Sequence, residues 1–248
     1  MSAEFGTVAE WTAQAAVELG PDYYIPAACR GSGSPAALDS LLDRLDLAPG
    51  ETLLDCGAGV GGPAAYAAQQ RSIRPVLVEP ELGACRAART LFDYPVIRAA
   101  GARLPLSDES FDAVWALGVL CTMSAQLGLL TELRRVVRSR GRIGLLVFVL
   151  RTPGGEQPEG NHFPTADSLT DLVERAQLRI EDWQGTSELP PIPRAWQHRE
   201  DEVTERLRER HGRRQAWQLA ERQSDLMARL LTDFAVTGEL LTLYRHHR

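Results

Sequence analysis

The chain has 248 residues, of which 44% are hydrophobic and 24% are charged, a composition typical of a folded globular protein and not of a disordered or fibrous one. All 27 residues counted as Lys or Arg are Arg, so the chain has no Lys. This excludes mechanisms that need a lysine within the chain, such as the Schiff base of pyridoxal enzymes and the Tyr-Lys pair of short-chain dehydrogenases. The net charge of −6 gives no general attraction to phosphate backbones, so we expect no nucleic-acid partner.

The cysteines and the N-terminal residues carry no signal for metal binding, secretion or membrane insertion. No two cysteines form a C-x-x-C pair, so we expect no metal site and reduced thiols in a cytoplasmic protein. Residues 1–20 lack the basic and apolar regions of a secretion signal. The longest apolar run, residues 143–150, is far shorter than the roughly 20 residues that cross a bilayer. We therefore expect no membrane association.

Short apolar segments alternate with helical patterns from residue 35 onward. The first helical pattern opens at Pro35 and closes at Pro49-Gly50. The predicted strands are residues 52–56, 76–78, 96–99, 111–117, 143–150, 178–183 and 239–244. The predicted helices between them include 81–91, 127–137, which Gly141 should stop, and 166–176. Strands that are apolar on both faces and alternate with helices form a parallel sheet covered on both sides. The pattern thus predicts an α/β fold: a Rossmann-like, doubly wound, seven-stranded, mostly parallel sheet with helices on both faces.

The chain is predicted to be a single domain, 1–248, in three parts. Residues 1–34 form an N-terminal arm, residues 35–150 a core, and residues 151–248 a second half. In that half, the long helical stretch 194–234 is inserted before the last strand and could act as a lid. Its mixed charges from Arg199 to Arg214 favour a solvated helix face over RNA binding.

A glycine-rich turn follows the first predicted strand. Gly57, Gly59 and Gly62 match G-x-G-x-x-G between a strand and a helix, an arrangement that lets a backbone approach a ligand closely. Asp55 lies two residues before the turn, and Glu79 ends the next strand. A carboxylate at that second position can accept hydrogen bonds from the two hydroxyls of a ribose. The pattern therefore indicates an adenosine-containing ligand.

Two other interpretations of this turn stay open at this point. It could be a tight connection that binds nothing. It could also belong to a nicotinamide-dependent oxidoreductase, which uses the same glycines and an acidic ribose ligand. The position of Asp55 before the glycines speaks against the second interpretation.

Four segments in order give a specific resemblance to a known family. They are Leu53-Leu54-Asp55-Cys56-Gly57-Ala58-Gly59, then Val78-Glu79-Pro80, then residues 104–112 with the sequence LPLSDESFD, and then residues 133–138 followed by Gly141-Arg142. Together they resemble the motifs of class I S-adenosylmethionine-dependent methyltransferases of the small-molecule type. The resemblance covers roughly residues 35–150.

The resemblance implies a cofactor, an activity and a set of binding residues. The cofactor would be S-adenosylmethionine, leaving as S-adenosylhomocysteine, and the methyl group would pass to an oxygen, nitrogen or carbon nucleophile of a small molecule. The implied cofactor residues are Asp55, Gly57, Ala58, Gly59, Glu79, Pro80, Gly101, Ala102 and Leu117. A member that keeps the cofactor without methylating, and an NAD(P)-dependent oxidoreductase, are the alternatives.

Two positions depart from the family pattern. Where the family often has an acidic residue that holds the adenine amino group, this chain has Ala100. Many small-molecule members carry a His after the fourth strand, and residues 119–123 offer Thr122 instead. Backbone groups near Gly101 and Ala102 would then hold adenine, and a base must come from elsewhere.

Side chains outside the motifs supply further candidates. His162, in the loop after the fifth strand, is a candidate general base or an ordinary loop histidine. Arg30 could pair with the cofactor carboxylate. Tyr23, Tyr24, Thr122 and Trp196 are candidate substrate contacts, although the aromatic residues could equally serve packing. The expected partner is a small molecule, and the chain could also pair with a second copy of itself.

Overall fold

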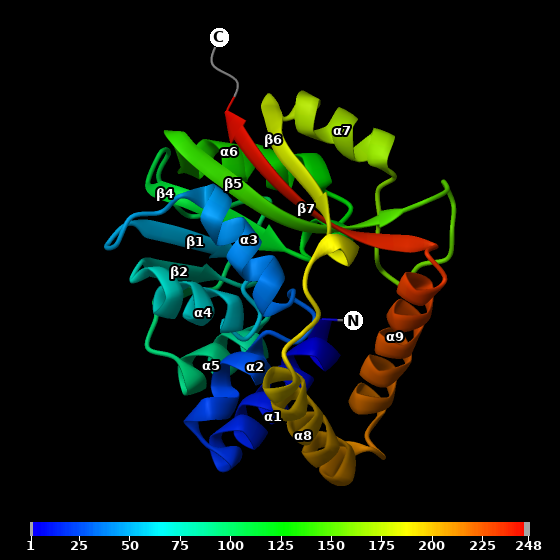
Figure 1. The fold of residues 1–248 in the computed structure, drawn as a ribbon. Helices are drawn as coiled ribbons and strands as arrows, with labels where there is room; N and C mark the ends of the chain where they lie inside the picture. The colour runs from blue at the N-terminus through cyan, green and yellow to red at the C-terminus, as the bar shows by residue number, and fades with distance from the viewer. Residues whose placement is uncertain (1, 246–248) are drawn as a thin grey trace.

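The computed structural model describes residues 2–245, and its centre is a seven-stranded sheet (Figure 1). The strands are β1 (Thr52–Cys56), β2 (Arg74–Val78), β3 (Val96–Ile97), β4 (Phe111–Leu117), β5 (Val137–Leu150), β6 (Leu178–Gly185) and β7 (Val236–Arg245). Their order is β3-β2-β1-β4-β5-β7-β6, and β7 runs antiparallel to both of its neighbours while the other pairs are parallel. The predicted doubly wound, mostly parallel sheet is confirmed.

Helices cover both faces of the sheet (Figure 1). One face carries α3 (Pro35–Leu45), α4 (Gly62–Arg71) and α5 (Leu82–Leu91), and the other carries α6 (Gln126–Val136) and α7 (Ala166–Arg175). The start of α3 follows from its sequence, because the Ser34 hydroxyl accepts a hydrogen bond from the Ala37 N–H and Pro35 occupies the first turn.

A third group of helices, here called the covering layer, packs beside the sheet. It consists of α1 (Ser2–Leu19), the short helix η1 (Pro21–Tyr23), α2 (Tyr24–Ala28), α8 (Arg194–His211) and α9 (Gln215–Thr232). Helix α1 packs against α5, α8 and α9, so segments from the two ends of the chain lie together (Figure 1). Two more short helices, η2 (Leu120–Thr122) and η3 (Thr186–Glu188), follow β4 and β6.

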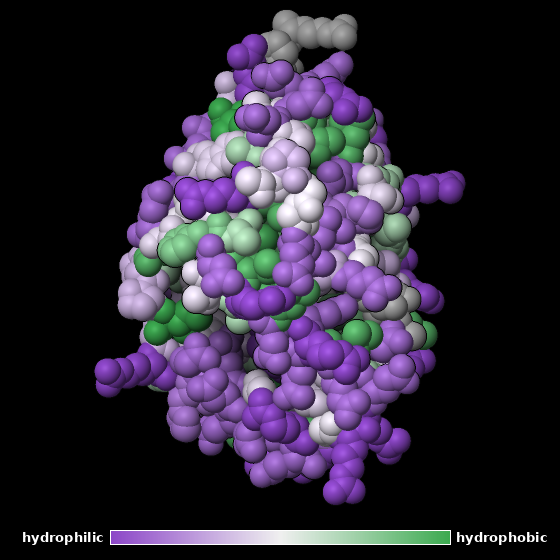
Figure 2. All heavy atoms as spheres, turned by 90° about the vertical axis from the view of Figure 1, so that its right-hand side faces the viewer, coloured by the Kyte–Doolittle hydropathy of each residue, from purple (hydrophilic) through white to green (hydrophobic). Residues whose placement is uncertain are grey.

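The face of the molecule toward which β1, β4 and β5 end is shown in Figure 2. Hydrophobic residues form separate patches there among hydrophilic ones, without one continuous apolar surface. Phe234 and Leu231, at the end of α9, are among the exposed large hydrophobic side chains. None of the helices within residues 2–245 is both long enough and apolar enough to span a bilayer.

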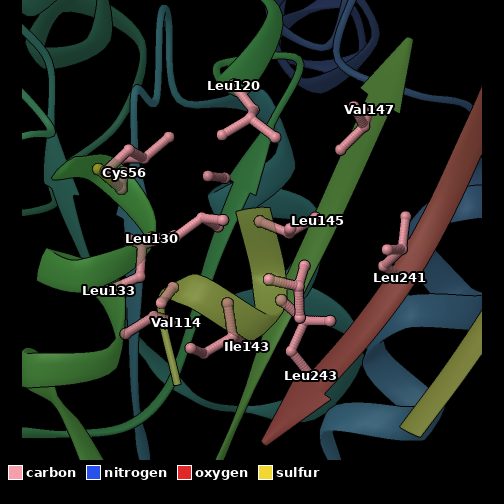
Figure 3. Packing of buried hydrophobic residues seen from close by; sticks show 14 of the residues in the cluster. Cys56, Val114, Leu120, Leu130, Leu133, Ile143, Leu145, Val147, Leu241 and Leu243 are labelled. Atoms are coloured by element: carbon pink, nitrogen blue, oxygen red, sulfur yellow. The ribbon is translucent and has the colours of Figure 1, made fainter. Parts of the chain in front are cut away.

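The largest hydrophobic cluster lies between β4, β5 and β7 on one side and α6 and α7 on the other (Figure 3). Val114, Ile143, Leu145 and Leu243 come from the strands, and Leu130 comes from α6; each is fully buried. Such burial contributes roughly 1.5–3 kcal/mol for each large aliphatic side chain. This cluster fixes the strands that end at the candidate site.

Several element boundaries differ from the sequence predictions. Strand β5 begins at Val137 rather than at residue 143, so Gly141 does not stop a helix. It lies inside the strand, where any β-carbon would collide with the Asp112 carbonyl oxygen. The helical stretch 194–234 is two helices, separated at residues 212–214, and β7 begins at Val236 rather than at residue 239. The N-terminal arm, for which no helix was predicted, is mostly helical.

Candidate active site at the carboxyl edge of the sheet

The glycine turn lies where the strand order reverses, because β1 has β2 on one side and β4 on the other. Ligands of open α/β sheets bind at this switch point, beyond the carboxyl ends of the strands. The N–H groups of Gly57 and Ala58 both donate to the Val78 carbonyl oxygen, at 2.7 and 3.0 Å. Gly57 has φ 78°, and a β-carbon there would collide with the Val119 side chain. The turn therefore needs glycine at position 57 for both conformation and space.

The last glycine of the motif serves packing. Gly62 opens α4, and a β-carbon on it would lie 2.5 Å from the Cys29 nitrogen and closer still to the Ala28 carbonyl carbon. The end of α2 therefore lies directly against the start of α4, backbone to backbone. The glycine turn and the N-terminal arm are therefore in direct contact.

Glu79 follows β2, and its carboxylate lies against the glycine turn. One oxygen accepts a hydrogen bond from the Gly59 N–H and the other from the Glu81 N–H, both at 2.9 Å. The side chain is buried. Burial raises the pKa of the Glu79 carboxyl, while these two N–H donors act to lower it. The carboxylate is held in one orientation and retains lone pairs for further donors.

Asp55 lies near the carboxyl end of β1 and is buried. Its Oδ2 atom has no hydrogen-bond partner in the part of the chain that the structure describes. Burial raises the pKa of the Asp55 carboxyl to about 7, and the negative charge of Glu79 acts in the same direction. A buried carboxylate oxygen without a donor is unfavourable, so this atom fits a site that a ligand or an ordered water completes.

The other residues implied to contact the cofactor lie around the ends of the same strands. Leu117 ends β4 and is buried, and the Pro80 carbonyl oxygen accepts a hydrogen bond from Arg98. A β-carbon on Gly101 would lie 3.0 Å from the Cys56 sulfur, which places Gly101 beside the end of β1. Ala102 follows it and packs near Gly128 of α6.

Arg30 lies in the segment that joins α2 to α3 across this edge. Gly31 approaches Gly118 after β4, and Gly33 approaches Leu146 of β5. The Arg30 side chain is exposed and has no hydrogen bond or ion pair within residues 2–245. Desolvation by the surrounding protein nevertheless lowers the pKa of its guanidinium, and the Glu200 carboxylate acts in the opposite direction.

The aromatic candidates occupy different places. The Tyr23 hydroxyl donates to Glu202 of α8, and Tyr24 contacts Phe92 edge to face, with ring centroids 6.5 Å apart. Trp196 is half-buried and meets Tyr66 edge to face at 5.9 Å. The structure thus places Trp196 against α4, whereas Tyr24 contacts Phe92 at the end of α5.

His162 and Thr122 lie close to each other beyond β4 and β5. The His162 N–H donates to the Cys121 carbonyl oxygen at 2.6 Å, and its side chain is exposed. The Thr122 hydroxyl donates to the Val119 carbonyl oxygen at 2.9 Å. The imidazole is therefore accessible near the end of β4.

The mixed charges from Arg199 to Arg214 predicted a solvated helix face, and this prediction was wrong for Glu200. Glu200 is half-buried, and its carboxylate accepts a hydrogen bond from the Trp196 indole N–H at 3.0 Å. The signal was present, because Trp196, Glu200, Val203 and Leu207 repeat at helical spacing. The strong charge alternation of the segment concealed it.

The strand order, the glycine turn and the buried acid after β2 agree with the resemblance to class I S-adenosylmethionine-dependent methyltransferases. Residues 54–145 match the family model described as a methyltransferase domain. The chain is 32% identical over 120 residues to the methyltransferase GfsG of Streptomyces halstedii, covering 46% of this chain and 43% of the relative. It is 34% identical over 119 residues to the 27-O-demethylrifamycin SV methyltransferase of Amycolatopsis mediterranei, covering 45% and 44%. The match thus spans less than half the length of these relatives.

Solved structures share the fold over most of the chain. The cyclopropane synthase MmaA2 of Mycobacterium tuberculosis aligns with TM-score 0.68 and 17% identity, over 84% of this chain and 82% of that one. The cyclase SpnF aligns with TM-score 0.66 and 24% identity, over 84% and 79%. At these identities the likeness establishes the fold alone.

Proposed function

We propose that this protein transfers the methyl group of S-adenosylmethionine to an oxygen, nitrogen or carbon nucleophile of a small molecule. The observation that carries the proposal is the oriented Glu79 carboxylate, held by two backbone N–H groups against the glycine turn. Two further features fit the cofactor: the Asp55 oxygen without a donor, and the Arg30 guanidinium without a partner in the described chain.

Each part of the cofactor has a partner in this proposal. Glu79 accepts hydrogen bonds from the ribose hydroxyls, and backbone groups of Gly101 and Ala102 hold adenine beside Leu117 and Pro80. The turn from Gly57 to Gly59 lies along the methionine part together with Asp55. Arg30 pairs with the carboxylate, because a guanidinium matches a carboxylate with two parallel hydrogen bonds.

S-adenosylmethionine supplies a methyl group already activated by its sulfonium. The protein then has to hold the nucleophile in line and exclude water, which α1, α8 and α9 do by covering the edge. An oxygen or carbon nucleophile must also lose a proton. His162, which is exposed close to the end of β4, is the proposed acceptor of that proton.

We propose an acceptor that is largely apolar. Ile25, Val119 and Phe148 near the strand ends, and Leu219 and Met227 in the middle of α9, are half-buried. Tyr23, Thr122 and Trp196 supply polar and aromatic contacts in the proposal. One relative is named as a demethylmenaquinone methyltransferase, from Corynebacterium urealyticum, and is 36% identical over 106 residues, covering 42% of this chain and 45% of the relative. Another is named as a 27-O-demethylrifamycin SV methyltransferase. Both names support an organic acceptor.

In this proposal residues 1–248 form one methyltransferase domain. Residues 1–34 are the arm, residues 35–150 the cofactor core, and residues 151–248 the substrate-facing half with a lid at 194–234.

Titration calorimetry with S-adenosylhomocysteine tests the cofactor site. We expect the wild-type chain to bind it and Glu79→Gln to weaken binding by about ten- to a hundredfold, since a hydrogen bond to a charged group contributes about 1.5–3 kcal/mol. Glu81→Gln is the matched control. It removes a neighbouring carboxylate and keeps the backbone N–H that Glu79 accepts, so its affinity should equal that of the wild type.

The same experiment separates the alternatives. Equal affinity in Glu79→Gln and the wild type would contradict the ribose assignment. Binding of NADH without binding of S-adenosylhomocysteine would establish the oxidoreductase instead. Firm binding of S-adenosylhomocysteine, with none of it formed from S-adenosylmethionine and any apolar acceptor, would indicate a member that keeps the cofactor without methylating.

A further inference from the structure

Helix α8 presents one inward-facing stripe that contains a carboxylate. Trp196, Glu200, Val203 and Leu207 recur every three or four residues, so they share one side of the helix. Val203 and Leu207 are fully buried, and Trp196 packs on Tyr66 of α4. A carboxylate in an apolar stripe is unfavourable unless a cation or donors face it.

The hydrogen bonds around Glu200 fix its position. Trp196 donates to one carboxylate oxygen, and Tyr66, which the Trp196 ring contacts, donates its hydroxyl to Asp39 of α3 at 2.9 Å. The second Glu200 oxygen has no hydrogen-bond partner in the part of the chain described. One oxygen is thus held by Trp196, whose ring packs on α4, and the other remains available to a ligand.

Arg30 lies in the segment directly after α2, and α2 packs on α8. Glu200 and Arg30 interact electrostatically, yet they form no ion pair within 4.0 Å. Burial raises the pKa of the Glu200 carboxyl, while the Trp196 indole and Arg30 act to lower it. The two opposite charges therefore lie on neighbouring elements and influence each other without pairing.

We propose that Glu200 binds the α-ammonium group of the cofactor's amino-acid end while Arg30 binds the carboxylate, so that α8 is part of the cofactor site. In an α-amino acid the ammonium and the carboxylate are attached to the same carbon, so their recognition needs one anionic and one cationic group from neighbouring elements that do not pair with each other. The inference rests on the proposed function. It makes Glu200 a cofactor-binding residue contributed by the second half of the chain.

Calorimetry with two ligands tests the proposal on the full chain. S-adenosylhomocysteine carries the amino-acid end, whereas 5′-methylthioadenosine has the same adenosine and thioether without it. We expect Glu200→Gln to lower the affinity for S-adenosylhomocysteine about tenfold, roughly 1.4 kcal/mol, and to leave the affinity for 5′-methylthioadenosine unchanged. Unchanged binding of the second ligand also shows that the variant is folded.

Glu209→Gln is the matched control, because Glu209 is exposed on the outer side of the same helix, and it should bind both ligands like the wild type. Equal affinity of Glu200→Gln and the wild type for S-adenosylhomocysteine would overturn the proposal, and so would equal losses for both ligands. A higher KM for the acceptor with unchanged S-adenosylhomocysteine affinity would also overturn it, since Glu200 would then contact the acceptor. Failure of the wild type to bind either ligand would contradict the proposed function instead.

Discussion

The glycine turn and the covering layer lie on the same edge of the sheet but are held in place by different forces. The turn is fixed by backbone contacts, so that any side chain at Gly57 or Gly62 collides with its surroundings. Helices α8 and α9 of the covering layer are held largely by side chains. Arg206 and Arg210 of α8 pair with Glu18 of α1, and the Trp11 and His211 rings stack with centroids 3.8 Å apart.

This difference separates what must stay constant from what can change. Exposed ion pairs contribute little and are screened by salt, whereas a backbone contact has no substitute. Only Val203 and Leu207 of α8 and Trp217 and Leu230 of α9 are buried. Helices α8 and α9 can therefore be remodelled for another acceptor while the turn keeps its geometry.

The largest expected effect concerns the turn. Gly62→Ala should destabilise the protein by about 3 kcal/mol, because the new methyl group meets the Ala28 and Cys29 backbone and cannot rotate away. Urea denaturation measures the change. Gly128→Ala is the control, because Gly128 lies inside α6 and a β-carbon there would be 3.4 Å from the Ala102 methyl group, an ordinary contact. This variant should be as stable as the wild type or up to about 1 kcal/mol more stable. Equal stability of the two variants would show that the turn tolerates side chains.

The second effect concerns the buried acid beside the turn. The pKa of Asp55 is about 7 in the folded protein against 3.8 for the free group, so folding favours the neutral form. Its contribution to stability is complete below pH 3.8 and is lost as the pH rises through 7. The Asp55→Asn variant lacks this titration. Its free energy of unfolding minus that of the wild type should therefore rise by about 2 kcal/mol from pH 5 to pH 7. Denaturation curves at both pH values measure it, and a constant difference would contradict the raised pKa.

The smallest effect concerns the covering layer. Desolvation lowers the pKa of His211, and the positive charges of Arg214 and Arg210 act in the same direction. A depressed pKa means that the stacked ring stabilises the fold above pH 6.5, and this contribution is lost as the pH falls. When the pH falls from 7.5 to 5, the rate of amide hydrogen exchange in α8, corrected for intrinsic rates, should therefore increase more than the rate in β4. His211→Gln should abolish this change, and a similar change in the variant would assign the titration to another group.

The sheet and the glycine turn could be predicted because their signals are local. Apolar strands, a glycine that requires φ 78° and an acid at the end of the next strand are all visible over a few residues. The start of β5 could not be predicted, since Gly141 is required by Asp112 on the neighbouring strand, and no local pattern shows that contact.

The covering layer was harder to predict from the sequence, because its contacts also join residues that are distant in the chain. The inward orientation of Glu200 follows from the packing of α8 on α1 and α2, more than 160 residues away in the sequence. Helix α1 lies against α5 through a close approach of Gly6 and Gly83, where a β-carbon on Gly83 would collide with the Gly6 carbonyl. Small residues permit such a contact, but their spacing in the sequence does not identify the helix against which they pack.

The position of β7 bears on the order in which the molecule assembles. This strand inserts between β5 and β6, although it follows both in the sequence. Until residues 236–245 are in place, β6 has no neighbour to pair with and β5 presents an open edge that can recruit foreign strands. Completion of the sheet depends on contacts of high sequence separation, which are formed slowly.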